Sequence, residues 1–254
     1  MINSKKFLRV NYGSTVHGKE ELKAVIKVIN NSTQMGKNVN KFEKKIAKIF
    51  KKKYGVMTNS GTSALFLAIE ALNLKKNSEI ITPALTFGTT VGSIIKNNLT
   101  PVFVDVKLNT LCIDEDKIEE KITKKTRAIL APDLIGNVCN WIKIKKIAKK
   151  YNLLVIQDSA DTLGATLNGL STGSYSDLSI TSFYGSHIIN GAGNGGMLCT
   201  SNLRIYNKTK VLRSWGRSSS LFNNSESIEN RFNTKIQNIH YDKKFIFEAI
   251  GYQL

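Results

Sequence analysis

Short apolar runs alternate with amphipathic segments over most of this chain, and this alternation constrains the fold more than any other feature. Helical periodicity and helix-start residues predict helices at 20–30, 40–52, 62–73, 88–97 and 140–151. Apolar runs predict strands at 54–58, 79–82, 101–105, 127–131, 153–157 and 178–183. Strands that alternate with helices favour an α/β domain with a mostly parallel sheet and helices on both faces.

Polar and glycine-containing loops follow four of the predicted strands. They read NSGTSA, TPALTF, QDSAD and SFYGSH, in chain order. Sheets of this class bind ligands at the carboxyl ends of their parallel strands, where such loops converge. The sequence therefore predicts a binding site at this edge.

Each candidate in these loops also has a purely structural interpretation. Ser60 and the Gly-Thr pair after it suit a phosphate cradle at a helix N-terminus, or only a helix cap. Asp158 is a functional acid or a cap, and Phe87 is a cofactor platform or a core residue. His187 precedes a glycine run, and a lone histidine is often structural. Taken singly, these four residues leave both interpretations open.

The net charge of +18 raises the question of nucleic-acid binding. The lysines are dispersed, however, and in KKIAKIFKKK and KIKKIAKK they alternate with apolar residues at helical spacing. Such runs form the solvated face of amphipathic helices, and no basic motif interleaved with aromatic residues accompanies them. We expect no nucleic-acid partner.

The cysteines and the apolar segments indicate the compartment. Cys112, Cys139 and Cys199 are far apart, odd in number and in no CxxC pair, which favours free buried thiols over disulfides or structural zinc. No run of eighteen apolar residues suggests a membrane span, and the start MINSKKFLRVNYGS lacks the apolar core of a signal peptide. We expect a cytoplasmic protein.

Six motifs in a fixed order are together more specific than any one of them. Over about residues 9–204 the chain resembles the DegT/DnrJ/EryC1/StrS family of sugar aminotransferases, which implies the large domain of fold-type-I pyridoxal-phosphate enzymes. The resemblance rests on NSGTSAL (59–65), ITPALTFGTT (81–90), PVFVDV (101–106), GNVCNW (136–141), QDSADTLGA (157–165) and SFYGSH…GGM (182–197).

The resemblance implies a role for most of the candidate residues. Gly61, Thr62 and Ser182 would hold the phosphate of pyridoxal or pyridoxamine phosphate. Phe87 would stack on the pyridine ring. Asp158 would pair with the ring nitrogen and keep it protonated, which makes the ring an electron sink.

The lysine that bonds covalently to the cofactor in this family is replaced here. The family pattern SFxxxK aligns its lysine with His187, and the segment from Tyr151 to Asn207 contains no lysine at all. Asp161 falls where the family commonly has Gln or His, near the ring hydroxyl. Restoring a lysine by shifting the alignment is therefore excluded within this segment.

Histidine at this position resembles one branch of the family, the pyridoxamine-phosphate-dependent 3-dehydratases of nucleotide-activated 4-keto-6-deoxy sugars. Imidazole titrates near neutrality and suits a proton-abstracting base, so His187 and Asp158 are the implied catalytic residues. Part of this branch carries an iron–sulfur cluster on cysteines. Ala160, Ser218 and Ser220 stand at about those positions, so we expect no cluster and no metal.

The resemblance also implies how the chain is organised and what it meets. Residues 1–240 would form the cofactor-binding domain, and 241–254 the start of a connection to a C-terminal small domain that this chain lacks. A homodimer, a nucleotide sugar and glutamate as amino donor are the implied partners, in deoxysugar or O-antigen synthesis. The alternatives are a sugar aminotransferase of the same family and a non-catalytic homologue acting as a binding subunit or fragment.

Overall fold

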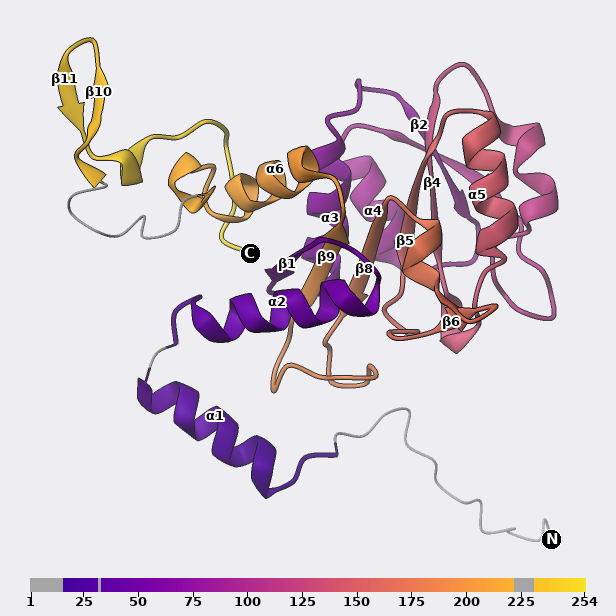
Figure 1. The fold of residues 1–254 in the computed structure, drawn as a ribbon. Helices are drawn as coiled ribbons and strands as arrows, with labels where there is room; N and C mark the ends of the chain where they lie inside the picture. Colours follow the sequence, from indigo (N-terminus) through magenta and orange to yellow (C-terminus); the bar gives the residue numbers. More distant parts are fainter. Residues whose placement is uncertain (1–15, 32, 222–230) are drawn as a thin grey trace, which may run out of the picture.

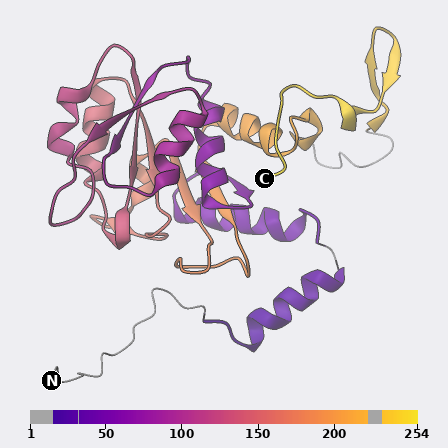
Figure 2. The same ribbon diagram turned by 180° about the vertical axis from the view of Figure 1, so that it is seen from behind.

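The protein is described by a computed structural model that covers residues 16–31, 33–221 and 231–254. A seven-stranded sheet forms the centre, and helices pack on both of its faces (Figures 1 and 2). The signal-peptide interpretation of the first fourteen residues, and parts of the predicted domain 1–240, lie outside the described residues. The predicted α/β class with a mostly parallel sheet is confirmed.

The strands of the central sheet run in the order β1-β9-β8-β5-β4-β2-β3. Only β9 is antiparallel to its neighbours, so the other six strands end at one common edge. The strands are β1 (Tyr54–Thr58), β2 (Glu79–Pro83), β3 (Thr100–Val104), β4 (Thr126–Pro132), β5 (Leu154–Asp158), β8 (Leu178–Ser182) and β9 (Gly196–Thr200).

Successive residues of each strand point to opposite faces of the sheet, which divides the core in two. On β2, for example, Ile80 packs with the helices of one face and Ile81 with those of the other. The first face carries α3 (Gly61–Leu72), α4 (Gly88–Lys96) and α6 (Leu203–Arg213), and the second carries α2 (Lys37–Ile49) and α5 (Trp141–Lys150). Both faces being covered explains why the strands read as apolar runs.

Most predicted boundaries agree with the structure within one residue, and α2 is the largest exception. It begins at Lys37 and ends at Ile49, three residues earlier at each end than predicted. The helix ends there because Lys51 adopts a left-handed conformation (φ 54°), which lets the chain turn into β1. The run KKK at 51–53 contains no Gly, Asn or Pro, the residues that usually indicate a helix C-terminus.

Several elements were not predicted from the sequence. They are β9, α6, the short pair β6 (Thr166–Leu167) and β7 (Leu170–Ser171), and the hairpin of β10 (Thr234–Ile236) and β11 (Ile239–Tyr241). The hairpin and α1 (Lys19–Asn31) project from the sheet and its helices (Figure 1).

Residues 241–254, predicted to lead out of the domain, pack back onto the end of α6. Tyr252 N–H donates to Leu212 O at 2.6 Å, and Trp215 N–H donates to Tyr252 O at 2.9 Å. Gly216 permits this approach, because a Cβ there would lie 1.8 Å from Ala249 O. In the part of the chain that the structure describes, no helix combines the length and apolar character that crossing a membrane requires.

Candidate active site

The predicted phosphate cradle lies at the start of α3. Ser60 is the N-cap, and its hydroxyl accepts a hydrogen bond from Ser63 N–H at 3.1 Å. The N–H groups of Gly61 and Thr62 have no acceptor among the described residues, as expected in the first turn of a helix. Ser60 thus caps the helix, and the two following amides stay available for an anion.

Ser182, at the carboxyl end of β8, lies against this helix start. A Cβ on Gly61 would stand 2.7 Å from the Ser182 Cβ, so only glycine allows the two loops to come this close. The structure therefore brings together the three residues predicted to hold a phosphate, Gly61, Thr62 and Ser182. Their role in holding it stays a prediction.

Asp158 ends β5 at the same edge of the sheet. Its Oδ1 accepts from Ala160 N–H at 3.1 Å, the only hydrogen bond to this carboxylate among the described residues, and none of their ion pairs includes it. Burial raises the pKa of Asp158 to about 6, and the nearby carboxylates of Asp161 and Asp133 add to the shift. An ionised Asp158 therefore needs a cation, and none of the described residues supplies one.

Phe87 precedes α4 in the loop after β2, and its side chain is 70% exposed. The interpretation of Phe87 as a core residue is therefore wrong. An exposed aromatic ring at the ligand-binding edge of an α/β sheet is available as a stacking surface.

His187 lies on the loop after β8, and its side chain is about one-fifth exposed. Its Nε2 is 3.6 Å from Asp161 Oδ1, and its Nδ1 is buried with no hydrogen-bond partner among the described residues. The Tyr184 ring packs edge-on against the imidazole, with centroids 5.9 Å apart. The structure thus brings together two predicted site residues, His187 and Asp161, from different loops.

Asp133, at the carboxyl end of β4, was missed in the sequence although it has the same signal as Asp158. It is 1% exposed and accepts four hydrogen bonds of 2.8 to 3.1 Å. The donors are Cys139 N–H, Trp141 Nε1, Gln157 Nε2 and Thr162 Oγ1. Burial raises the pKa of Asp133, and these four donors oppose that shift. Asp133 ties the loops after β4 and β5 together.

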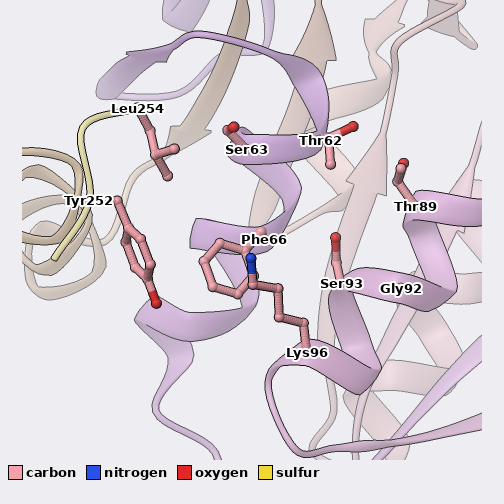
Figure 3. Close-up of a pocket in the computed structure, with 9 residues that line it drawn as sticks. All are labelled: Thr62, Ser63, Phe66, Thr89, Gly92, Ser93, Lys96, Tyr252 and Leu254. Atoms are coloured by element: carbon pink, nitrogen blue, oxygen red, sulfur yellow. The ribbon is translucent and has the colours of Figure 1, made fainter. Parts of the chain in front are cut away.

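A pocket of about 320 Å³ lies beside the cradle, between α3 and α4 (Figure 3). Of the predicted site residues, only Thr62 lines this pocket. Lys96 and Phe66 also line it, and the Lys96 amine lies 4.6 Å from the centroid of the Phe66 ring. Tyr252 and Leu254 close it from the C-terminal segment. The pocket therefore adjoins the predicted phosphate site and does not enclose the catalytic candidates.

The positions expected to lack cluster ligands are Ala160, Ser218 and Ser220, and Ser218 is buried. Cys112, Cys139 and Cys199 are buried free thiols, as predicted. The described residues contain no group of three or more His, Cys, Asp or Glu side chains arranged to hold a metal ion. The absence of an iron–sulfur cluster stays a prediction.

The family assignment is decided by a match that spans most of the chain. Residues 15–241 match the model of the DegT/DnrJ/EryC1/StrS aminotransferase family. The chain belongs to this family. Similar members include a dTDP-4-dehydro-2,6-dideoxy-D-glucose 3-dehydratase of Saccharopolyspora spinosa, 34% identical over 86% of this chain and 50% of that protein. A GDP-perosamine synthase of Caulobacter vibrioides is 36% identical over 72% of this chain and 49% of that protein.

Solved structures of DegT/DnrJ/EryC1/StrS relatives agree with the fold. GDP-4-keto-6-deoxy-D-mannose-3-dehydratase of E. coli, with bound hydrated PLP, superimposes with a TM-score of 0.85 at 31% identity, over 97% of this chain and 64% of that one. A structure of a GDP-4-keto-6-deoxymannose-3-dehydratase holding a trapped PLP-glutamate geminal diamine gives the same TM-score at 30% identity, with the same coverage. The fold-type-I assignment is confirmed, and the chain spans about half the length of the curated relatives it matches.

The residues of this chain fit pyridoxal or pyridoxamine phosphate. Asp158 has a carboxylate whose ionised form requires a cation, and the start of α3 offers two backbone N–H groups without acceptors. Phe87, on the loop after β2, exposes its ring. A protonated pyridine nitrogen, a phosphate and a flat ring are the ligand groups that match these three features.

Proposed function

We propose that this chain is the cofactor-binding part of a pyridoxamine-phosphate-dependent enzyme that removes the C3 hydroxyl of a nucleotide-activated 4-keto-6-deoxy sugar. The observation that carries the proposal is His187, an imidazole with one ring nitrogen buried and without a partner, on the loop where the family pattern has its lysine. Similarity to two 3-dehydratases supports this reaction class.

Each residue of the site has one task in this proposal. The Gly61 and Thr62 amides and the Ser182 hydroxyl bind the phosphate, and Phe87 covers one face of the ring and excludes water from it. Asp158 holds a proton on the ring nitrogen through its negative charge. When bound, the cofactor supplies an electron sink and the amine that condenses with the sugar ketone. His187 accepts the proton removed from the cofactor's 4′ carbon, and its protonated ring can donate that proton to the departing C3 hydroxyl, which leaves as water.

The imidazole decides between dehydration and amine transfer. A lysine would hold the cofactor covalently and carry the proton as an amine, whereas His187 leaves the amine form of the cofactor free. A sugar aminotransferase is the second candidate, favoured by the similarity to GDP-perosamine synthase. A non-catalytic binding subunit is the third. Cytoplasmic location, a homodimer and glutamate as amino donor belong to the proposal, and the relative with the PLP-glutamate adduct supports the last of these.

The test is cofactor exchange followed by the reaction with glutamate. The purified full chain should take up pyridoxal phosphate reversibly, and glutamate should convert it to the pyridoxamine form, both followed by absorbance. His187→Asn should keep the affinity and lose about a hundred- to ten-thousandfold in the rate of this conversion. A chain that binds neither form of the cofactor would be the non-catalytic homologue. An amino sugar formed from the 4-keto sugar would favour the aminotransferase.

A further inference from the structure

Asp161 bridges the loop after β4 and the loop after β8. Its Oδ2 accepts a hydrogen bond from Ile135 N–H at 3.0 Å, and its Oδ1 lies 3.6 Å from His187 Nε2. One carboxylate oxygen is therefore fixed by backbone, and the other faces the imidazole. The 3.6 Å separation is longer than a hydrogen bond, so the contact in this conformation is electrostatic.

The backbone that holds Asp161 is strained. Ile135 has φ 56° and ψ 35°, a left-handed conformation that costs a β-branched residue about 1–2 kcal/mol. Packing of its side chain does not account for this strain, because that side chain is 69% exposed. The conformation directs the Ile135 N–H at Asp161. A strained residue next to a candidate catalytic group points to a functional constraint.

The loop that carries Asp161 is anchored a second time, at the next residue. The Thr162 hydroxyl donates to the buried Asp133 carboxylate at 3.1 Å, and the Ser159 and Thr162 hydroxyls are 2.7 Å apart. Asp161 is thus held from the loop after β4 through two separate hydrogen bonds, one to its own side chain and one to its neighbour's. Such support fixes a side chain to the accuracy that proton transfer requires.

The chemistry of a carboxylate separates Asp161 from the residues usual at this position. Gln donates through its amide N–H and His through its ring N–H, so both can donate to a ring oxygen of the cofactor. An ionised Asp only accepts. The His187 imidazole beside it has Nε2, a possible donor, facing this acceptor. Its Nδ1 is buried and has no partner among the described residues. A buried acceptor without a partner costs about 1–3 kcal/mol unless a ligand uses it.

We propose that Asp161 is the positioning residue of His187. Its carboxylate keeps the proton of the neutral imidazole on Nε2 and leaves the lone pair on Nδ1 to accept a proton. After that transfer the imidazolium carries one positive charge, which the neighbouring carboxylate of Asp161 stabilises. The assignment rests on the proposed function, since it gives Asp161 a task only where His187 is the base.

The first test needs no cofactor. The chain has only three histidines, His17, His187 and His240, so selective ¹⁵N labelling gives three imidazole pairs, and His187→Asn identifies one of them. In the wild type the two His187 nitrogens should have widely separated shifts, as for a single Nε2–H tautomer. Asp161→Ala should bring them together, with His240 unchanged. An equal separation in both proteins would overturn the assignment.

The second test is a double-mutant cycle on the glutamate-dependent conversion of pyridoxal phosphate. Asp161→Asn keeps an oxygen that can accept from Ile135 N–H and removes only the charge. It should slow the conversion about tenfold when His187 is present and change nothing further in the His187→Asn background. Asp161→Glu, which restores the charge, should recover part of the rate. Asp116→Asn, which removes a carboxylate of a surface ion-pair group, is the matched control and should leave the rate unchanged.

The outcomes separate this inference from the proposed function. If the wild type binds neither form of the cofactor, the proposed function fails whatever the imidazole spectra show. If the wild type binds and converts the cofactor but Asp161→Asn slows both backgrounds equally, Asp161 acts on another group and only the inference fails. Loss of fold in Asp161→Ala would appear in its thermal unfolding, and Asp161→Asn then decides the case.

Discussion

The sheet with α2–α6 and the two projecting elements, α1 and the β10–β11 hairpin, are built differently. In the first region nearly every helix has a buried face, and Ile46 of α2 is 2% exposed. In the second, every residue of α1 is exposed, including Leu22 and Ile26, and so is every residue of β11. α1 is amphipathic, yet it buries its apolar side against nothing that the structure describes.

This difference shows what the chain supports by itself. All of the predicted site residues lie in the first region, at strand ends, at the start of α3 or in the loops beside them, where buried groups such as Asp133 fix the loops. We therefore expect cofactor binding to depend on the packed region. An isolated helix of thirteen residues is marginal in water, so we expect α1 to gain stability from contacts beyond the described residues.

The largest expected effect compares an isoleucine of α2 with an isoleucine of α1, two helices of thirteen residues each. Ile46→Ala in α2 should lower the free energy of unfolding by about 2–5 kcal/mol, because it leaves a cavity against Phe183 and Met197. Ile26→Ala in α1 should change it by less than about 0.5 kcal/mol, because that side chain is 47% exposed. Chemical denaturation of both variants measures this. Equal losses would mean that α1 is packed in solution and that the two regions are not distinct.

The next effect concerns the stability of the cofactor-free protein. The pKa of Asp158 is raised to about 6 in the folded state, so its ionised form destabilises the fold. The stability that the protonated form provides is present below about pH 4 and lost as the pH rises through about 6. At pH 7.5 the free energy of unfolding of Asp158→Asn should therefore exceed that of the wild type by up to about 3 kcal/mol, measured by thermal unfolding, and the difference should vanish near pH 4.

Asp158→Asn should also bind the cofactor more weakly than the wild type. Pyridoxal phosphate should raise the melting temperature of the wild type at pH 7.5 and that of Asp158→Asn much less, because the amide cannot offset a protonated ring nitrogen. If the variant gains no stability at pH 7.5 and binds the cofactor as well as the wild type, Asp158 is only a cap of the turn at Ala160.

The smallest effect concerns the strained turn at Ile135, in the loop after β4. Ile135→Gly relieves the left-handed conformation and keeps the N–H that Asp161 accepts, so stability should rise by no more than about 1 kcal/mol and cofactor affinity should not change. Urea unfolding and a cofactor titration measure both. A clear loss of stability would mean that the exposed Ile135 side chain has a packing partner in solution.

The fold was predictable from sequence because it depends on patterns that sequence displays. Apolar runs marked the parallel strands, and the loops after four of them contained the candidate residues. Strand β9 was missed because GGMLCT follows glycines and runs antiparallel, so no helix separates it from β8. The end of α2 was missed because a left-handed lysine has no sequence signature.

The candidate site was predictable as a list of residues, and its supporting contacts were not. Asp158 and His187 were found from their places at strand ends and in motifs. The pairing of Asp161 with His187 depends on the strained turn at Ile135 and on the buried Asp133, which bring separate loops together. These contacts are set by tertiary packing, which one sequence does not contain. The exposure of Phe87 likewise depends on how the loop after β2 leaves the sheet.

The central claim is that this chain holds its cofactor without a covalent bond to lysine. The direct measurement is borohydride reduction of the protein loaded with pyridoxal phosphate, followed by digestion and mass spectrometry. The wild type should carry no stoichiometric pyridoxyl group on lysine and should release the cofactor on dialysis, since residues 151–207 contain no lysine. His187→Lys, the positive control, should carry one pyridoxyl group at position 187. One stoichiometric pyridoxyl-lysine in the wild type, at a residue needed for cofactor binding, would contradict the account.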